Sequence, residues 1–338
     1  MTTLLLDLAL ARRIELAEAH AAVDCAKALV RLQPAAGAEV QAVAGGFAMY
    51  CGANSPVTQA VGLGLAGPVS EEEFDRLEEF YRSREEGVRV ETCPLADASL
   101  IKHFEERGYR VTEFSNVMAL LLQGLGFQDG PAAGVAIELV GDGQMDLWTL
   151  TVSQGFSENF PVTQGILEVM KMFAAGFGVE CYLARLDGAV AGGGTLALRG
   201  GVAGLFGAST LPAFRGRGVQ TALLRWRLKR AVERGCNLAV CLAAPGSVSE
   251  RNAVRQGFSA LYTRVKFERG WDYEAWATRL WMKSTMSCVE VPGRKISAMP
   301  DFFSSAASAS GMIPPSRTVT SVMPFSLRSF MSCGQMVL

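Results

Sequence analysis

Hydrophobic and polar positions follow the same order in two separate parts of the chain. At 88–91 a strand-like run comes after an amphipathic helical stretch that ends in Gly87, and at 237–241 a similar run comes after a helical stretch that ends in Gly235. Each run leads into a shorter helical stretch, a glycine in the C-cap position, and an aromatic residue that opens another strand-like run. The pattern predicts strand, helix, strand, helix, strand in both halves.

The two short helical stretches set the offset between the halves. One is closed by Gly108 and the other by Gly257, so the two glycines are 149 positions apart. A repeat of this length indicates two copies of one α/β unit. We expect an N-terminal domain at 1–124, a Gly-rich linker at 125–134 and a second domain at 135–272.

The chain changes character after the second domain. From 273 to 338 serine and methionine are frequent, acidic residues are few, and prolines interrupt any regular periodicity. We therefore expect 273–338 to be a poorly ordered tail that takes no part in the fold.

The second copy contains a short glycine-rich loop between a strand and a helix. The strand ends at Pro212, Gly216 and Gly218 follow, and a helix is expected to begin near Gly218. Glycines let the backbone curl, so that N–H groups at the helix N-terminus converge on one point and bind an anion such as a diphosphate. Arg215 and Arg217 add positive charge beside this point.

The first copy has no such loop. Ser70 and Glu73 form a capping-box pattern, in which side chains of the helix itself occupy its first N–H groups. Eight acidic and three basic residues lie between Glu71 and Glu86, and such a cluster repels phosphate. We therefore assign the anion site to the second copy alone.

The helix after the glycine loop is strongly basic. Between 213 and 234 there are seven basic residues and one acidic residue. The spacing predicts an apolar stripe of Leu224, Leu228 and 231–232. The bases expected to point away from this stripe are Arg225, Arg227, Lys229, Arg230 and Arg234. A solvated basic face and a nucleic-acid surface are the two alternatives to an anion site here.

Net charge, cysteine and histidine content, and the length of apolar runs argue against several classes of function. Lys and Arg number 32 against 33 Asp and Glu, and a net charge of -1 gives no global field to attract nucleic acid or an anionic membrane. The eight cysteines contain no CxxC pair and the two histidines are far apart, so we expect reduced thiols, no metal site and no Ser-His-Asp triad. No apolar run reaches the ~18 residues of a membrane span, and we expect a soluble, cytoplasmic protein.

The segment Arg215-Gly216-Arg217-Gly218-Val219-Gln220 resembles the acetyl-CoA pyrophosphate loop of the GCN5-related N-acetyltransferase (GNAT) family, whose pattern is Arg/Gln-x-x-Gly-x-Gly/Ala. Pro212 before the loop and 221–224 after it agree with the family's strand and helix flanks. The stretch 249–258, a helix that ends in Gly-Phe, resembles the family's second cofactor motif. The resemblance covers about 135–269 well and the first copy weakly.

This resemblance implies an α/β fold of two GNAT-like units, each a mixed, mostly antiparallel sheet flanked by helices, with a degenerate N-terminal copy. It also implies acetyl-CoA as cosubstrate, with backbone N–H groups holding the pyrophosphate, exposed strand backbone at 209–211 binding pantetheine, and a later helix facing the thiol arm. The residues that it assigns to acetyl-CoA are Ser209, Thr210, Leu211, Arg215, Gly216, Arg217, Gly218, Val219, Gln220, Thr221, Ser249 and Asn252.

Two positions depart from the family pattern. Gln220 stands at a Gly/Ala position, and Ala253 stands where the family often has a tyrosine that protonates the leaving thiolate. Tyr262 is a substitute candidate for the acid, and a half-buried strand aromatic is the alternative interpretation. Glu158 or Glu168 could take the proton of the amine, although lone surface acids are more often merely solvated.

The leading hypothesis is an acetyl-CoA-dependent N-acetyltransferase that moves an acetyl group to a primary amine of a small molecule or peptide by direct attack. The alternative is a non-catalytic acyl-CoA-binding or sensing protein, to which Ala253 points. Nucleic-acid binding is disfavoured by the near-neutral chain. The identity of the amine acceptor and the choice between monomer and homodimer stay open.

Overall fold

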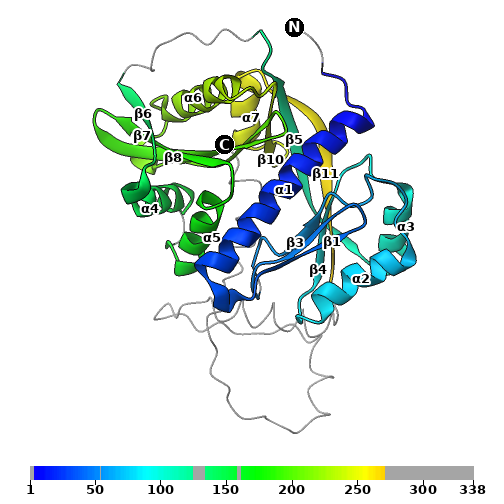
Figure 1. The fold of residues 1–338 in the computed structure, drawn as a ribbon. Helices are drawn as coiled ribbons and strands as arrows, with labels where there is room; N and C mark the ends of the chain where they lie inside the picture. Colours follow the sequence, from blue (N-terminus) through cyan, green and yellow to red (C-terminus); the bar gives the residue numbers. More distant parts are fainter. Residues whose placement is uncertain (1–3, 54, 125–133, 158–160, 271–338) are drawn as a thin grey trace, which may run out of the picture. The chain divides into compact units, whose positions relative to one another are not determined.

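The computed structural model describes residues 4–53, 55–124, 134–157 and 161–270 (Figure 1). The predicted tail at 273–338 and all but the last residue of the predicted linker at 125–134 lie outside the described residues. Within the described part of the chain, every helix is too short or too polar to cross a membrane.

The first half opens with a long helix and then alternates strands and helices. Asp7 caps the first helix by accepting a hydrogen bond from the N–H of Leu10 at 2.7 Å, and the predicted capping box of Ser70 and Glu73 is present at the start of α2. The elements are α1 (Leu8–Leu32), the 3-10 turn η1 (Pro34–Ala36), β1 (Glu39–Val43), β2 (Gly46–Tyr50), β3 (Gln59–Val61), α2 (Glu71–Arg82), β4 (Val88–Thr92), α3 (Ala98–Glu106) and β5 (Arg110–Leu121).

The second half has the same order of strands and helices in its later part, as the periodicity predicts. Gly108 and Gly257 follow the short helices α3 and α7 with positive φ angles of 71° and 92°, which confirms both as helix-ending glycines. The elements are β6 (Val135–Leu139), η2 (Asp142–Gln144), α4 (Met145–Phe156), α5 (Gln164–Ala174), β7 (Val179–Leu186), β8 (Ala189–Arg199), β9 (Val202–Thr210), η3 (Pro212–Phe214), α6 (Val219–Glu233), β10 (Leu238–Ala243), α7 (Val248–Arg255) and β11 (Ser259–Arg269).

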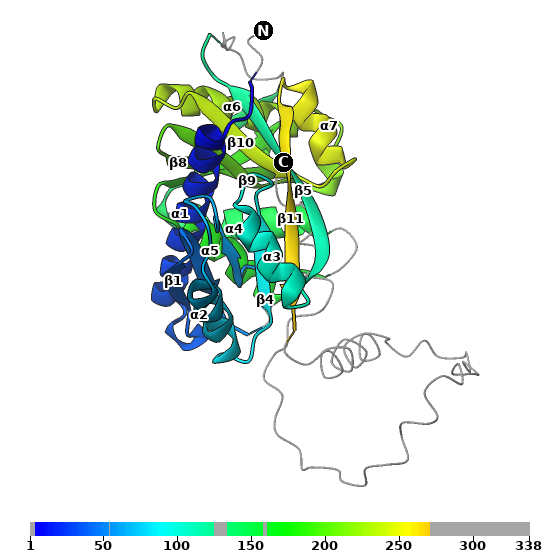
Figure 2. The same cartoon turned by 90° about the vertical axis from the view of Figure 1, so that its right-hand side faces the viewer.

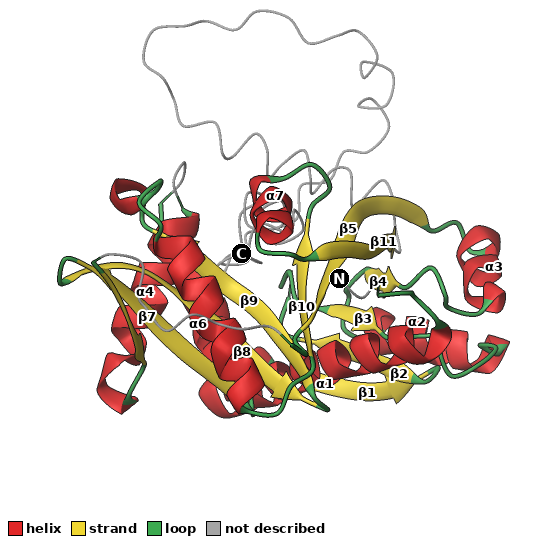
Figure 3. Ribbon diagram, turned by 90° about the horizontal axis from the view of Figure 1, so that it is seen from above, coloured by secondary structure: helices red, strands yellow, loops and turns green. Residues whose placement is uncertain are grey.

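The eleven strands of the described residues belong to one sheet, in the order β1-β2-β3-β4-β11-β5-β10-β9-β8-β7-β6. Figure 3 shows this sheet from above. Two neighbouring pairs, β3–β4 and β9–β10, are parallel, and the other pairs are antiparallel. The last strand of each half pairs with the other half, because β5 lies against β10 and β11 lies against β4. The mixed α/β class is therefore confirmed, and the sheet is continuous across both halves through exchanged strands.

The pairing of β5 with β11 agrees with the predicted repeat. Ser115 on β5 lies opposite Arg264 on β11, and these two residues are also 149 positions apart. Two equivalent strands that pair antiparallel at equivalent residues are related by a local two-fold axis. This register supports two copies of one unit that meet at this strand pair.

Strand exchange predicts that the second half does not fold alone. A chain limited to 134–270 lacks β4 and β5, so β10 loses its partner on one side and β11 loses both of its neighbours. We expect this fragment to aggregate or to unfold without a cooperative transition, whereas a chain limited to 1–270 unfolds cooperatively. Urea unfolding and size-exclusion chromatography check this expectation, and a monomeric, cooperatively folded fragment would contradict it.

Strand β10 separates two parts of the core. Ala239 and Cys241 belong to the cluster that contains the buried side chains of α6, while Leu238 and Val240 belong to the cluster that contains α1. These alternate positions point to opposite faces of the sheet. Helix α1 also packs against β2, β8, β9 and α5, so it connects strands of both halves (Figure 1).

The predicted apolar stripe of α6 is confirmed at Leu224, Leu228 and Ala231, which are buried, but Arg227 and Val232 differ from the prediction. Arg227 is fully buried and its Nη1 donates to the carbonyl of Thr195 at 2.9 Å, while Val232, expected to be buried, is 39% exposed. Arg227 lies one turn from both Leu223 and Ala231, so helical spacing places it on the inner face. Burial lowers the pKa of the Arg227 guanidinium to about 10.

Candidate active site

Two glycines form an open N-terminus on α6, the helix labelled near the top of Figure 2. Gly216 and Gly218 have φ angles of 73° and 82°, and Gly218 is the N-cap residue of a helix whose first turn has no acidic side chain. A Cβ atom added to Gly218 would meet none of the described atoms within 4 Å. The side chain of Val219 is buried and that of Thr221 is half-buried. The groups that this helix end can offer to an anion are therefore its first backbone N–H groups, which have no partner within the helix.

Both arginines of the loop are held by contacts with neighbouring segments. The Nη2 of Arg215 donates to the carbonyl of Gly155 at 3.0 Å, and its Nε donates to the carbonyl of Thr210 at 3.3 Å. The Nη2 of Arg217 lies 3.0 Å from an oxygen of Asp187, and at least half of each of these two side chains is exposed. An exposed ion pair contributes less than about 1 kcal/mol, so Arg217 can turn to a phosphate at little cost.

Strands β9 and β10 separate at the end that faces this loop. Their parallel pairing stops at Gly204 and Val240, although β9 continues to Thr210 and β10 continues to Ala243. A bulge near Gly207, which has a φ angle of 56°, shifts the register of β9 against β8. The facing edges beyond Gly204 and Val240 therefore do not pair with each other and can accept an extended ligand between them.

The predicted residues at the end of β9 contribute in different ways. The hydroxyl of Ser209 is buried and donates to a backbone carbonyl of α4 at 2.9 Å, and the N–H of Leu211 donates to a carbonyl of β8 at 2.8 Å. Thr210 Oγ1 donates to Gln220 Oε1 at 3.4 Å, while the buried Nε2 of Gln220 has no hydrogen-bond partner among the described residues. An unpartnered donor beside an open helix end fits the negatively charged group that the loop is expected to hold.

Helix α7 places the second cofactor motif beside β10 and β5. Ser249 and Asn252 are half-buried, and Asn252 accepts a hydrogen bond from Arg255 at 3.1 Å. Ala253 is fully buried in the core on the α6 side of the sheet. The part of the chain around position 253 is thus packed against the sheet, and the assignment of Ser249 and Asn252 to acetyl-CoA stays a prediction.

Of the predicted catalytic residues, Tyr262 and Glu168 make hydrogen bonds with residues outside the glycine loop. Tyr262 is buried and its hydroxyl donates to Glu15 at 2.6 Å, and burial raises the pKa of this phenol. Glu158 lies outside the described residues. Glu168 is half-buried on α5 and accepts a hydrogen bond from Gln164 at 3.0 Å. The acid and base roles of Tyr262 and Glu158 stay predictions.

Sequence reasoning missed a buried ionic network between α1 and β11. The Nε of Arg264 lies 2.8 Å from Glu15, and its two Nη atoms lie 2.6 and 2.7 Å from the two oxygens of Glu18. The side chains of Arg264 and Glu15 are 3% and 2% exposed. Glu15 and Arg264 are 249 positions apart, so periodicity, which is a local signal, could not reveal the contact.

The same network continues onto β4 and β5. Lys266 Nζ lies 3.2 Å from Glu91 and 2.7 Å from Glu113. Burial raises the pKa of Glu113 to about 7, with Lys266 opposing the shift. Glu91 is largely buried, yet the charges of Lys266 and Arg264 outweigh that burial and lower its pKa. Four carboxylates, those of Glu15, Glu18, Glu91 and Glu113, thus share the two cations Arg264 and Lys266.

A cavity of about 230 Å³ lies between α1 and the sheet, next to this network. Its walls come from both halves: α1, β2, β3 and β4 on one side, and α5, β8, β9 and β10 on the other. Most of the lining is apolar. The charged residues of the lining are Glu18, Glu91, Arg199 and Lys266.

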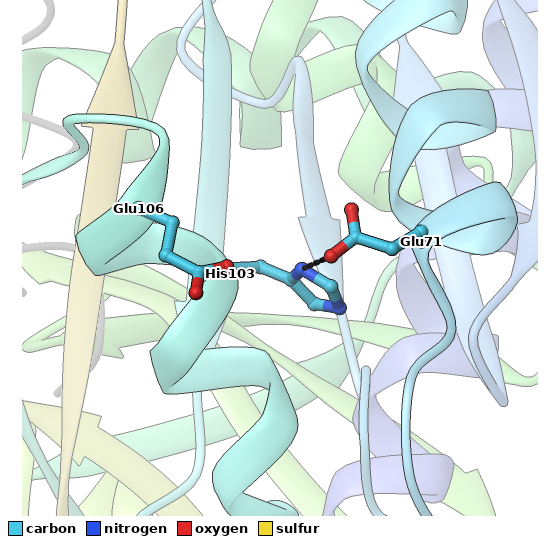
Figure 4. Close-up of side chains that lie close together, drawn as sticks. All are labelled: Glu71, His103 and Glu106. Atoms are coloured by element: carbon cyan, nitrogen blue, oxygen red, sulfur yellow. Dashed lines mark ion pairs between the residues drawn. The ribbon is translucent and has the colours of Figure 1, made fainter.

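Glu71, His103 and Glu106 form a separate cluster on α2 and α3 (Figure 4). His103 is buried, its Nε2 donates to the carbonyl of Val69 at 2.9 Å, and its ring stacks on Phe74. The protein's own cations neutralise both carboxylates, since Arg107 pairs with Glu71 and Lys102 with Glu106. These contacts account for the cluster as packing between α2 and α3.

Comparison with known proteins agrees with the glycine loop and the separated strands. Residues 149–258 match the model of the Acetyltransferase (GNAT) family. The chain therefore contains a GNAT acetyltransferase domain, and that domain includes the open end of α6, the ends of β9 and β10, and α7. A search of curated proteins gave no match.

Several solved structures match the chain at low sequence identity. A GCN5-related N-acetyltransferase from Kribbella flavida matches with a TM-score of 0.53 and 16% identity over 75% of this chain and 98% of that chain, which shows a shared fold. A GCN5-related N-acetyltransferase from Sphaerobacter thermophilus matches with a TM-score of 0.48 and 17% identity over 69% of this chain and 75% of that one. A tandem GNAT protein from the clavulanic acid biosynthesis pathway matches with a TM-score of 0.48 and 15% identity, over 66% and 77%.

Proposed function

We propose that this protein is an N-acetyltransferase that uses acetyl-CoA and acetylates a primary amine of a small molecule or peptide. The observation that carries the proposal is the uncapped N-terminus of α6 behind Gly216 and Gly218, placed beside the separated ends of β9 and β10. The helix end supplies donors for the pyrophosphate, and the strand ends flank the pantetheine arm. We also propose that 1–124 is a degenerate copy, that 135–272 is catalytic, and that the protein is cytoplasmic and needs no metal.

The proposed reaction is a direct transfer. The amine nitrogen attacks the thioester carbonyl carbon, a C–N bond forms, the C–S bond breaks, and CoA leaves as the thiolate. The nitrogen loses one proton and the thiolate gains one, so the products are an amide and CoA. We propose that backbone N–H groups near the bulge at Gly207 stabilise the oxyanion that develops on the carbonyl oxygen, because the bulge interrupts the regular pairing of β9 with β8.

The test is release of free thiol from acetyl-CoA in the presence of a panel of primary amines. We expect thiol release with at least one amine at a rate that depends on enzyme concentration. Acetyl-CoA alone should raise the thermal midpoint of the protein. No thermal shift and no calorimetric heat with acetyl-CoA would contradict the proposal.

A non-catalytic acyl-CoA-binding protein is the second candidate. Two observations favour it: Ala253 is buried and has no acidic group, and the hydroxyl of Tyr262, the substitute candidate for the acid, donates to Glu15. A thermal shift with acetyl-CoA but no thiol release with any amine would select this second function.

A further inference from the structure

We infer that Arg227 is a positioning residue for the acetyl transfer, and that its buried positive charge, acting through the backbone of β8 and β9, stabilises the negative charge that develops on the thioester carbonyl oxygen. The inference rests on the proposed function and adds to it a residue outside those expected to touch acetyl-CoA. Three features of Arg227 carry it: its place beside the bulge of β9, its hydrogen bond to β8, and its lack of a counter-charge.

The guanidinium of Arg227 packs against the backbone of β8 opposite the bulge of β9. The bulge falls between Gly193 and Thr195 of β8, so Gly194 lies opposite it. A Cβ atom built on Gly194 would lie 3.2 Å from the Cζ of Arg227 and 2.9 Å from the Cβ of Ala208 on β9. Because Gly194 has no side chain, the guanidinium reaches the strand backbone on the α6 face of the sheet.

Two hydrogen bonds connect the guanidinium with the bulge. The Nη1 of Arg227 donates to the carbonyl of Thr195 at 2.9 Å. The buried hydroxyl of Thr195 in turn donates to the carbonyl of Phe206. That carbonyl shares a peptide unit with the N–H of Gly207, so the hydrogen bond that it accepts polarises this N–H. Arg227 therefore acts on the bulge through Thr195.

The positive charge of Arg227 has no carboxylate partner among the described residues. The side chain is fully buried, and its Nη2 has no hydrogen-bond partner in the described part of the chain. Two other arginines of the same helix differ in this respect, because Arg230 and Arg234 share the carboxylate of Glu180. The charge of Arg227 is thus neither solvated by water nor neutralised by an ion pair.

The titratable groups that interact with Arg227 do not cancel its charge. They are the phenol of Tyr182 and the thiol of Cys241, and burial raises the pKa of both, so that both are uncharged at neutral pH. The guanidinium, with a pKa of about 10, is a cation at that pH. In an interior without water such a charge acts over a longer distance than it would in solution.

The effect of this charge differs between the ground state and the transition state. The thioester carbonyl is neutral when acetyl-CoA binds and becomes negative when the amine attacks. A fixed positive charge beside the bulge therefore stabilises the transition state more than the bound acetyl-CoA. We expect Arg227 to affect kcat and the polarisation of the carbonyl, and to leave the affinity for acetyl-CoA unchanged.

Two substitutions of Arg227 separate its charge from its hydrogen bond. Arg227→Lys keeps the charge and Arg227→Gln removes it, while both side chains carry an N–H donor for the carbonyl of Thr195. A role limited to packing and hydrogen bonding predicts similar effects of the two. Arg225→Gln is the control, because it removes the same charge from an exposed position of α6, where salt and water screen it.

The carbonyl stretching frequency of bound acetyl-CoA, labelled with carbon-13 at the carbonyl, measures the polarisation without any amine. We expect this band at a higher frequency in Arg227→Gln than in the unaltered protein, and at an unchanged frequency in Arg227→Lys and Arg225→Gln. With an amine that supports turnover, Arg227→Gln should lower kcat at least about tenfold. The KM for acetyl-CoA and the thermal shift that it gives should not change.

The outcomes separate the inference from the proposed function. An unmoved band in Arg227→Gln, or equal displacement of the band in Arg227→Gln and Arg227→Lys, would overturn the inference while the acetyltransferase assignment stands. We expect Arg227→Gln to fold, because it removes a buried charge that lacks a partner. If it does not fold, a displaced band in Arg227→Lys overturns the inference. The absence of a thermal shift with acetyl-CoA in the unaltered protein would refute the proposed function itself.

Discussion

Replacing Gly218 by valine is expected to abolish the rise in thermal midpoint that acetyl-CoA gives the unaltered protein. A ligand present at a hundred times its Kd stabilises a protein by about 2.7 kcal/mol, which is a shift of several degrees for a domain of this size. Gly218 holds a φ angle of 82° at the N-cap of α6. A β-branched side chain disfavours that conformation and places two methyl groups in front of the N–H groups that would hold the pyrophosphate.

The matched control is Gly235→Val at the other end of the same helix. Gly235 has a φ angle of 80°, and a Cβ atom there also meets none of the described atoms within 4 Å. Both variants should therefore lose a similar, small amount of stability from backbone strain. Only Gly218→Val should lose the response to acetyl-CoA, measured by differential scanning fluorimetry and calorimetry. A full response in Gly218→Val would show that the end of α6 is not the pyrophosphate site.

Replacing Arg264 by alanine is expected to cause a large loss of stability. Arg264 is the cation that faces the buried carboxylate of Glu15, and it also holds both oxygens of Glu18. Its removal leaves a charge on Glu15 that is 2% exposed and has lost its ion-pair partner, and breaking a buried pair in this way costs about 3–5 kcal/mol. Urea unfolding of the two proteins measures the difference.

An exposed ion pair provides the comparison for Arg264→Ala. Arg76 lies 3.9 Å from Glu73 on α2, and the Arg76 side chain is 62% exposed. Arg76→Ala should change the free energy of unfolding by less than about 1 kcal/mol, because water already solvates both partners. If Arg264→Ala lowered the free energy of unfolding no more than Arg76→Ala does, the ionic network would not be the interaction that stabilises the packing of α1 against β11.

Local sequence signals predicted the strands and helices of the two repeated segments. The capping box at Ser70 and Glu73, the start of α6 after Gly218, and the glycines that close α3 and α7 were all correctly placed. Each of these depends on the backbone conformation or hydrogen bonding of residues within about one helical turn. The glycine loop could be assigned to anion binding for the same reason.

Contacts between distant residues could not be predicted in this way. The sequence indicated two similar units, but nothing local specifies that β11 inserts between β4 and β5, because strand partners are chosen by pairing across long separations. Arg227 was expected at the surface, yet helical spacing and the depth of α6 against β8 bury it. The hydrogen bond from the hydroxyl of Tyr262 to Glu15 joins residues 247 positions apart and could not be predicted either.

The sequence by itself determined the strands and helices of the two repeated segments and the position of the glycine loop, since the conformations that produce them are encoded by neighbouring residues. The tertiary structure alone decided the exchange of strands, the ionic network around Arg264 and the composite cavity. Those features join α1 to β11 and one half of the chain to the other, and they depend on burial and pairing that exist only once the whole sheet has formed.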